Sequence, residues 1–205
     1  MAEHTGESGQ SRFDEATASH GAKLLLTAFF TLLLSLSAQS FLKIPMPPDG
    51  VPQTLQTLVV VVAAMGLGGR WGMASVGLYL LIGALGAGVF SDGSRGMETL
   101  LGFTGGYLLG FFVSQPVIAW IVRRKDGTVR GWGAISTAML AGHAVVFVIG
   151  VPWLTFVLGR EDPTYDLSRG IEGGLLPFLP GMVLKSVAAV LIGLAIWPGS
   201  VRRFW

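Results

Sequence analysis

Long apolar runs alternate with short polar or Gly/Pro-rich breaks along most of this chain. Most of the runs carry few charges and approach or exceed the length of about 18 residues that a helix needs to cross the hydrocarbon core of a bilayer. We therefore predict an all-α integral membrane protein, a bundle of six transmembrane helices. The six runs cover about 22–42, 54–67, 71–90, 104–122, 131–158 and 175–197.

The break between the first two runs is rich in proline. It reads KIPMPPDGVPQ and contains four prolines, each of which lacks an amide donor and restricts the residue before it. A continuous helix is excluded there, so we expect a loop. Because this loop leads directly into Thr54 and Gln56 at the mouth of the next span, we expect it to act as a lid over a pocket.

The two ends of the chain are polar. Residues 1–21 lack an apolar segment of the signal-peptide type, so we expect a disordered cytoplasmic tail there. Residues 22–199 form the predicted membrane domain, and 200–205 a short basic cytoplasmic tail. The composition agrees with a multi-pass protein of the cell inner (plasma) membrane, because 51% of residues are hydrophobic and only 13% are charged.

The basic residues favour one orientation in the bilayer. With the N-terminus inside, nine Lys and Arg residues lie in cytoplasmic segments and four lie outside, so the positive-inside rule predicts N-in and C-in. The outer loops are then the longer ones, where binding loops are expected. The inner set is Arg12, Lys23, Arg70, Arg123, Arg124, Lys125, Arg130, Arg202 and Arg203, and the outer set is Lys43, Arg95, Arg160 and Arg169.

Catalytic signatures are missing from the predicted spans. The chain contains no H-E-x-x-H or G-x-S-x-G motif and no pair of carboxylates within a span, and it has no P-loop and no cysteine. We therefore expect a protein that is not an enzyme and that uses no cofactor, no metal and no nucleic-acid partner.

Lys185 is the most informative polar residue, because a cation inside an apolar run is costly and usually faces a cavity or a partner. If the last helix begins near Pro180, Lys185 lies roughly 8 Å below its start; if it begins near Leu175, the depth is roughly 15 Å. The nearby helix N-terminus adds positive potential, which suits an anion such as a carboxylate. The alternative is that the long side chain snorkels toward water.

Other polar and aromatic residues complete a candidate binding site. Thr54 and Gln56 lie at the mouth of the second span, and Phe90 is an aromatic residue that could line a pocket. Tyr107 either anchors the membrane interface or lines a pocket beside its neighbouring glycines. His143 stands alone in AMLAGHAVVFVIG, so it is either a packing residue or a ligand contact.

A stripe of small hydroxylated residues occupies the first span. Thr27, Thr31 and Ser35 recur at helical spacing, and small residues at this spacing let helices approach closely in lipid. The stripe is either a packing face within the chain or a contact with another membrane subunit.

Four motifs in order resemble the BioY family, the biotin-binding S components of energy-coupling factor (ECF) vitamin transporters. They are VPQTLQTLVVVVAAMGLGGRWG, GLYLLIGALGAGVF, GFTGGYLLGFF and LLPFLPGMVLK, and the match covers about residues 25–197. The resemblance implies a six-helix protein that captures biotin near the outer face. It also implies that a transmembrane T component and two ATPase subunits are partners in the lipid bilayer.

Two positions depart from the family pattern. The last motif of the family usually reads Pro-Gly-Asp-x-x-Lys, with the acid and the lysine both serving the ligand, whereas this chain has Met182 at the acid position and keeps Lys185. The family also tends to carry Ala-x-x-x-Ala on the first helix for contact with the T component. Here Thr27, Thr31 and Ser35 offer that spacing, so they are the predicted partner contact.

The sequence thus predicts a biotin-binding component of a vitamin uptake transporter. Its predicted substrate-binding residues are Lys185, Met182, Tyr107, Gln56, Thr54, Phe90 and His143. Met182 motivates an alternative, a component for another small carboxylated molecule. A further alternative is a small membrane enzyme or scaffold that uses the outer loops.

Overall fold

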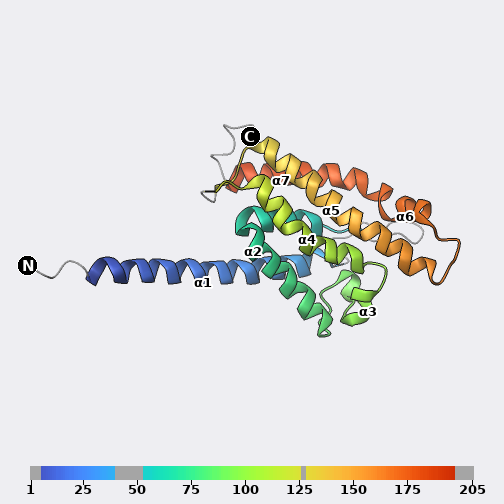
Figure 1. The fold of residues 1–205 in the computed structure, drawn as a ribbon, viewed down its shortest axis with the longest axis horizontal. Helices are drawn as coiled ribbons and strands as arrows, with labels where there is room; N and C mark the ends of the chain where they lie inside the picture. Colours follow the sequence, from blue (N-terminus) through green and yellow to red (C-terminus); the bar gives the residue numbers. More distant parts are fainter. Residues whose placement is uncertain (1–5, 40–52, 126–127, 197–205) are drawn as a thin grey trace, which may run out of the picture.

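The computed structural model describes residues 6–39, 53–125 and 128–196, and this part of the chain is helical (Figure 1). Five helical stretches within these ranges are long and apolar enough to cross a membrane. The proposed lid segment 43–52 and the C-terminal tail 200–205 lie outside the described residues. The elements are α1 (Gly6–Ser37), α2 (Gln56–Ala84), η2 (Ser91–Gly93), α3 (Gly96–Leu101), α4 (Gly105–Val122), α5 (Trp132–Gly159), α6 (Leu167–Gly174), η3 (Leu176–Phe178) and α7 (Leu179–Ile196).

Helix α2 folds back on itself at Gly68. In a straight helix, residues 56 and 79 would lie roughly 35 Å apart at 1.5 Å per residue. Instead, the Gln56 amide Nε2 donates to the Tyr79 hydroxyl at 2.7 Å. A Cβ added at Gly72 would lie 3.6 Å from the Cα of Ala64. The two limbs, 56–67 and 69–84, therefore run antiparallel, and the boundary that the sequence places between the second and third apolar runs is a real change of direction.

The fold-back depends on Gly68 and Arg123. Gly68 has φ 77° and ψ 175°, a conformation that a residue with a Cβ adopts only with strain. Arg123, which follows the C-terminus of α4, donates through Nη1 to the carbonyl oxygens of Met65 at 2.7 Å and Gly66 at 2.8 Å. Carbonyls at the end of a helix lack intrahelical partners and carry partial negative charge. The guanidinium therefore caps the first limb of α2.

Helices α4 and α5 pack extensively against each other. A Cβ added at Gly110 would lie 2.8 Å from the Cα of Val146, and one at Gly106 would overlap the side chain of Trp153. The pair Gly106 and Gly110 thus lets the two backbones approach closely, as small residues four apart do in membrane helices. This contact fixes Tyr107 of α4 and Phe147 of α5 in one aromatic cluster, with ring centroids 6.3 Å apart.

The N-terminal tail differs from the expectation. Helix α1 begins at Gly6, so the structure describes residues 6–21 as helix where the sequence analysis expects disorder, and this part extends away from the bundle (Figure 1). The segment contains no proline and several good helix formers. Adding residues to an existing helix avoids the cost of nucleation, so the polar segment continues the apolar one.

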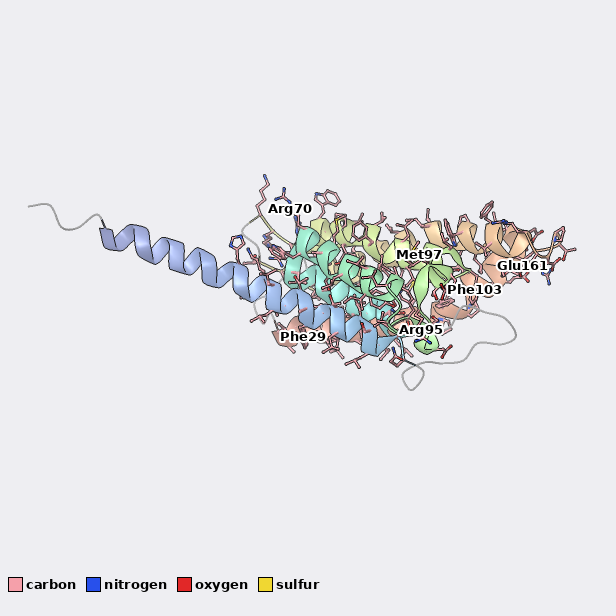
Figure 2. All side chains as sticks on the ribbon, turned by 90° about the horizontal axis from the view of Figure 1, so that it is seen from below. Phe29, Arg70, Arg95, Met97, Phe103 and Glu161 are labelled. Atoms are coloured by element: carbon pink, nitrogen blue, oxygen red, sulfur yellow. The ribbon has the colours of Figure 1, made fainter. Side chains whose placement is uncertain are left out.

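The hydroxyl stripe of α1 faces α2 within the chain. Thr27 and Thr31 are 6% and 4% exposed, and the Thr31 hydroxyl lies 3.0 Å from the carbonyl oxygen of Ser75 and 2.9 Å from that of Thr27. The half-buried Ser35 donates to the Thr31 carbonyl. In this chain Thr27 and Thr31 thus pack against α2, and the exposed surface of α1 is an apolar face that includes Phe29 (Figure 2).

The last part of the chain places Lys185 close to the start of its helix. Turn η3 precedes α7, and α7 begins at Leu179 with Pro180 in its first turn, where a proline costs nothing. This is the shallower of the two positions considered for Lys185. Figure 2 shows the charged residues Arg70 and Glu161 toward opposite ends of the bundle.

Candidate ligand-binding site

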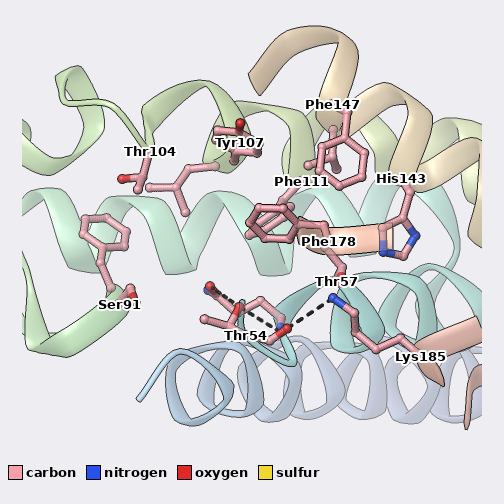
Figure 3. A pocket seen from close by; sticks show the side chains of 14 residues that line it. Thr54, Thr57, Ser91, Thr104, Tyr107, Phe111, His143, Phe147, Phe178 and Lys185 are labelled. Carbon is pink, nitrogen blue, oxygen red and sulfur yellow. Dashed lines mark hydrogen bonds between the residues drawn. The ribbon is translucent and has the colours of Figure 1, made fainter. Parts of the chain in front are cut away.

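Helices α2, α4, α5 and α7 enclose a cavity with η3 and the loops that flank α2 and α4 (Figure 3). Apolar atoms make up most of the surface of its wall, although half of the lining residues carry polar side chains. No acidic side chain is among the described residues that line it. The lining consists of Thr54, Gln56, Thr57, Phe90, Ser91, Thr104, Tyr107, Leu108, Phe111, His143, Val146, Phe147, Phe178 and Lys185.

Lys185 supplies the cation of the cavity. It is 6% exposed, and its ammonium Nζ donates to the carbonyl oxygen of Thr54 at 3.3 Å (Figure 3). An ammonium has three donors, and this one long bond uses a single donor. A buried cation needs more compensation than that. The described structure thus leaves Lys185 with capacity to bind a ligand oxygen, and it does not show the snorkelling alternative.

Three aromatic rings form one wall of the cavity. Tyr107 and Phe178 stack with an interplanar angle of 22°, and Phe147 packs edge-on against both. The Tyr107 hydroxyl donates to the carbonyl oxygen of Gly174 at 2.9 Å, which ties α4 to the end of α6. Tyr107 therefore offers the cavity its ring and uses its hydroxyl for structure.

The residues at the mouth of α2 are held in a hydrogen-bond chain. The Thr54 hydroxyl donates to Gln56 Oε1 at 3.1 Å, and Gln56 Nε2 donates to Tyr79. Phe90 is 1% exposed and packs edge-on against Tyr79, with ring centroids 5.4 Å apart. These contacts position the cavity wall, so the polar atoms of Gln56 are already satisfied by the protein.

Three buried polar atoms of the lining have no partner among the described residues. They are Thr57 Oγ1, Ser91 Oγ and His143 Nε2. An unpaired buried polar atom costs about 1–3 kcal/mol, so such atoms mark places where a ligand or water completes the site. Their position on the cavity wall makes them candidate ligand contacts.

The structure gathers six of the seven predicted substrate-binding residues into this cavity: Lys185, Tyr107, Gln56, Thr54, Phe90 and His143. The exception is Met182, which lines a groove on the outer side of α5 and α7 beside Trp132 and Ser186. Met182 and Lys185 are three residues apart, a helical rotation of about 300°, so they share a side of α7 without pointing in the same direction.

Several lining residues were not selected from the sequence. The aromatic members Phe111 and Phe147 lie four residues after Tyr107 and His143, so each pair shares a helix face. That spacing could have identified both. Ser91 and Phe178 lie in short 3-10 turns, and no helical periodicity points to them.

An apolar helical bundle with a cavity that is lined by several aromatic rings and by one buried cation is typical of a membrane protein that binds a small molecule. Comparison with known proteins gives the family: residues 11–202 match the model of the BioY family. The chain belongs to the BioY family, which confirms the resemblance found from the motifs.

Relatives of known name agree with this assignment. The chain is 33% identical over 181 residues to the biotin transporter BioY of Thermotoga maritima, covering 88% of this chain and 99% of that protein. It is 34% identical over 167 residues to the probable biotin transporter BioY of Pyrococcus horikoshii, with 82% and 91% covered. The crystal structure of the S-component for biotin from an ECF-type ABC transporter superposes with a TM-score of 0.75 at 26% identity, covering 87% and 92% of the two chains.

Proposed function

We propose that this chain is the biotin-binding S component of a vitamin uptake transporter and that it is not an enzyme. Family membership supports the class, and one structural observation carries the ligand type: the cavity joins a long aromatic wall to a single buried cation, Lys185. Biotin combines an apolar thioether-containing bicycle and aliphatic chain with two polar ends. The wall suits the apolar part, and the cation suits an oxygen of either end.

Binding of biotin by the purified protein tests this proposal. Protein from cells grown without biotin is titrated with biotin in detergent by calorimetry, and dethiobiotin and lipoate compete for the site in parallel. We expect saturable binding of one biotin per chain and weak competition by lipoate. Absence of biotin binding contradicts the proposal, and tighter binding of lipoate supports the alternative ligand class.

The proposed orientation has six spans with both ends in the cytoplasm of the inner membrane. The fold-back of α2 supports the count, because it divides this helix into two antiparallel limbs, 56–67 and 69–84. The chain has no cysteine, so single cysteines can report sidedness. We expect Glu161→Cys to react with an impermeant thiol reagent in intact cells and Lys125→Cys to react only after permeabilisation. The reverse pattern contradicts the orientation.

The proposed partners are a transmembrane T component and two ATPase subunits, as the family resemblance implies. Thr27 and Thr31 are buried in this chain, so the exposed apolar face of α1, which includes Leu25, Phe29 and Leu32, is the better candidate for this contact. Phe29→Ala should weaken co-purification with the partners and leave biotin binding by the isolated chain unchanged. Unchanged co-purification rejects this face.

A further inference from the structure

The ring of His143 is fixed in one direction by its own helix. Its Nδ1 lies 2.9 Å from the carbonyl oxygen of Met139, one turn earlier in α5, and the ring stacks on Phe147 at 6.0 Å between centroids. A carbonyl oxygen can only accept, so Nδ1 carries a hydrogen and donates it. Because Nδ1 is used within the helix, only Nε2 is available to a ligand in the cavity.

The remaining nitrogen, Nε2, is buried on the cavity wall and has no partner among the described residues. His143 is 3% exposed. It lines the same cavity as Lys185, and the described residues of the lining include no carboxylate. A second buried cation beside Lys185 would have no counter-ion, so the imidazole is neutral and Nε2 is a bare acceptor.

We propose that His143 Nε2 accepts a hydrogen bond from an N–H group of the bound ligand. This inference rests on the proposed function, because biotin carries N–H groups in its ureido ring alone. An ionised carboxylate has only acceptors and cannot satisfy Nε2. The ureido ring therefore lies at the end of the cavity that holds His143.

The two ends of the cavity differ in a way that agrees with this placement. In Figure 3, His143 and Lys185 lie toward one side, and Ser91 and Thr104 lie toward the other. An acceptor close to a cationic donor complements a group that presents N–H and C=O side by side. The ureido oxygen then falls on the side of Lys185, whereas the sequence analysis expects that lysine to bind the carboxylate.

Two variants distinguish the contribution of the Nε2 acceptor to biotin binding from that of the ring's shape. In His143→Phe the ring remains and the acceptor is lost, and in His143→Gln an amide oxygen can reach the position of Nε2. Loss of a buried hydrogen bond should reduce biotin affinity by about tenfold in His143→Phe. His143→Gln should retain most of it. Equal affinities of the two variants would overturn the proposal.

Nitrogen NMR of the unmutated protein reports the hydrogen bonding of His143 Nε2 directly. If His143 only packs against its neighbours, this resonance should not change when biotin binds. The chain has three histidines, so the signals of His143 are assigned by comparing histidine-labelled protein with His143→Gln. We expect a neutral ring with a bare Nε2 before biotin is added and a shift of that resonance toward the hydrogen-bonded position afterwards. A protonated Nε2 in the empty protein, or no shift while biotin binds, overturns the inference and leaves the proposed function standing. Failure of the unmutated protein to bind biotin overturns both.

Discussion

Two cations enter the bundle from its ends, and the protein uses them differently. Arg123, at the end of α4, is half-buried and donates to two carbonyl oxygens at 2.7 and 2.8 Å. Lys185, near the start of α7, is more deeply buried and reaches a single carbonyl oxygen at 3.3 Å. The more buried cation is thus the less satisfied one.

The comparison teaches how to separate a structural charge from a functional one in a membrane. The fold-back of α2 leaves the carbonyl oxygens of Met65 and Gly66 without partners inside the helix. Arg123 donates hydrogen bonds to both, so its charge stabilises the end of the first limb. Lys185 faces a cavity in which the described residues supply too few hydrogen-bond acceptors for its ammonium group. Burial alone does not separate a structural cation from a functional one. The number of its N–H donors that have a partner within the protein does.

The largest expected effect is that of Lys185→Met on ligand binding. Methionine keeps the length of the side chain and removes the donors, so biotin affinity should fall about 10- to 100-fold, the cost of a hydrogen bond to a charged group. The folded protein should be as stable as before or more stable, because an under-compensated buried charge is removed. Calorimetry and thermal unfolding measure the two quantities. Leu184→Met, at an exposed neighbouring position, is the matched control.

Arg123→Ala should show the opposite pattern. Loss of the cap leaves the carbonyls of Met65 and Gly66 unpaired and should lower the free energy of unfolding by about 1–3 kcal/mol. Biotin affinity of the folded protein should stay the same, because Arg123 does not line the cavity. Lys125→Ala, which removes an exposed cation two residues away, should change neither quantity. A large loss of affinity without loss of stability would contradict the structural role of Arg123.

Gly68→Ala tests the same break from its other side. A Cβ at Gly68 would make only ordinary contact with Arg123, at 3.5 Å from Nε, so the cost is conformational. Backbone with a positive φ and a ψ near 180° is essentially limited to glycine, and a residue with a Cβ held there costs about 1–3 kcal/mol. Gly21→Ala, at a helical position with open space around it, should be neutral or stabilising. Equal effects of the two substitutions in thermal unfolding would show that Gly68 bears no strain.

The smallest effect is expected at an exposed charge pair. Asp162 accepts hydrogen bonds from the hydroxyl and backbone amide of Thr164 and from Arg169, and these lower the pKa of its carboxyl group. A lowered pKa in the folded state stabilises the protein above the unfolded-state pKa, and the contribution disappears as pH falls through the folded-state value. Because the pair is exposed, Asp162→Asn should produce no resolvable change in unfolding temperature at neutral pH. A clear loss would contradict this view of surface pairs.

The sequence predicts the helical class and most of the site because apolar length and rare intramembrane polar groups are strong signals. Lys185 stands out for the cost of a charge in an apolar run, and the structure places it in the cavity. The break near Gly68 was visible as a change in pattern. Its meaning as an antiparallel fold-back was not, because the direction of the second limb follows from tertiary contacts, such as that between Gln56 and Tyr79.

Positions that depend on rotation about a helix could not be read from the sequence. Met182 shares a side of α7 with Lys185 by spacing, but it lines the outer groove between α5 and α7 and is not part of the cavity wall. The stripe of Thr27 and Thr31 has the spacing of an intermolecular contact, and within this chain it packs against α2. Spacing gives the face of a helix, and tertiary packing decides what that face meets.

The stabilisation of the protein by biotin tests the central claim most directly. A ligand that binds only the folded state raises the unfolding temperature, and the rise grows with the logarithm of the ratio between ligand concentration and Kd. We predict that biotin raises the unfolding temperature of the unmutated protein and of Arg123→Ala by similar amounts, although Arg123→Ala starts lower, and that the increase is small or absent in Lys185→Met. An equal increase in Lys185→Met, or no increase in the unmutated protein, would contradict the account.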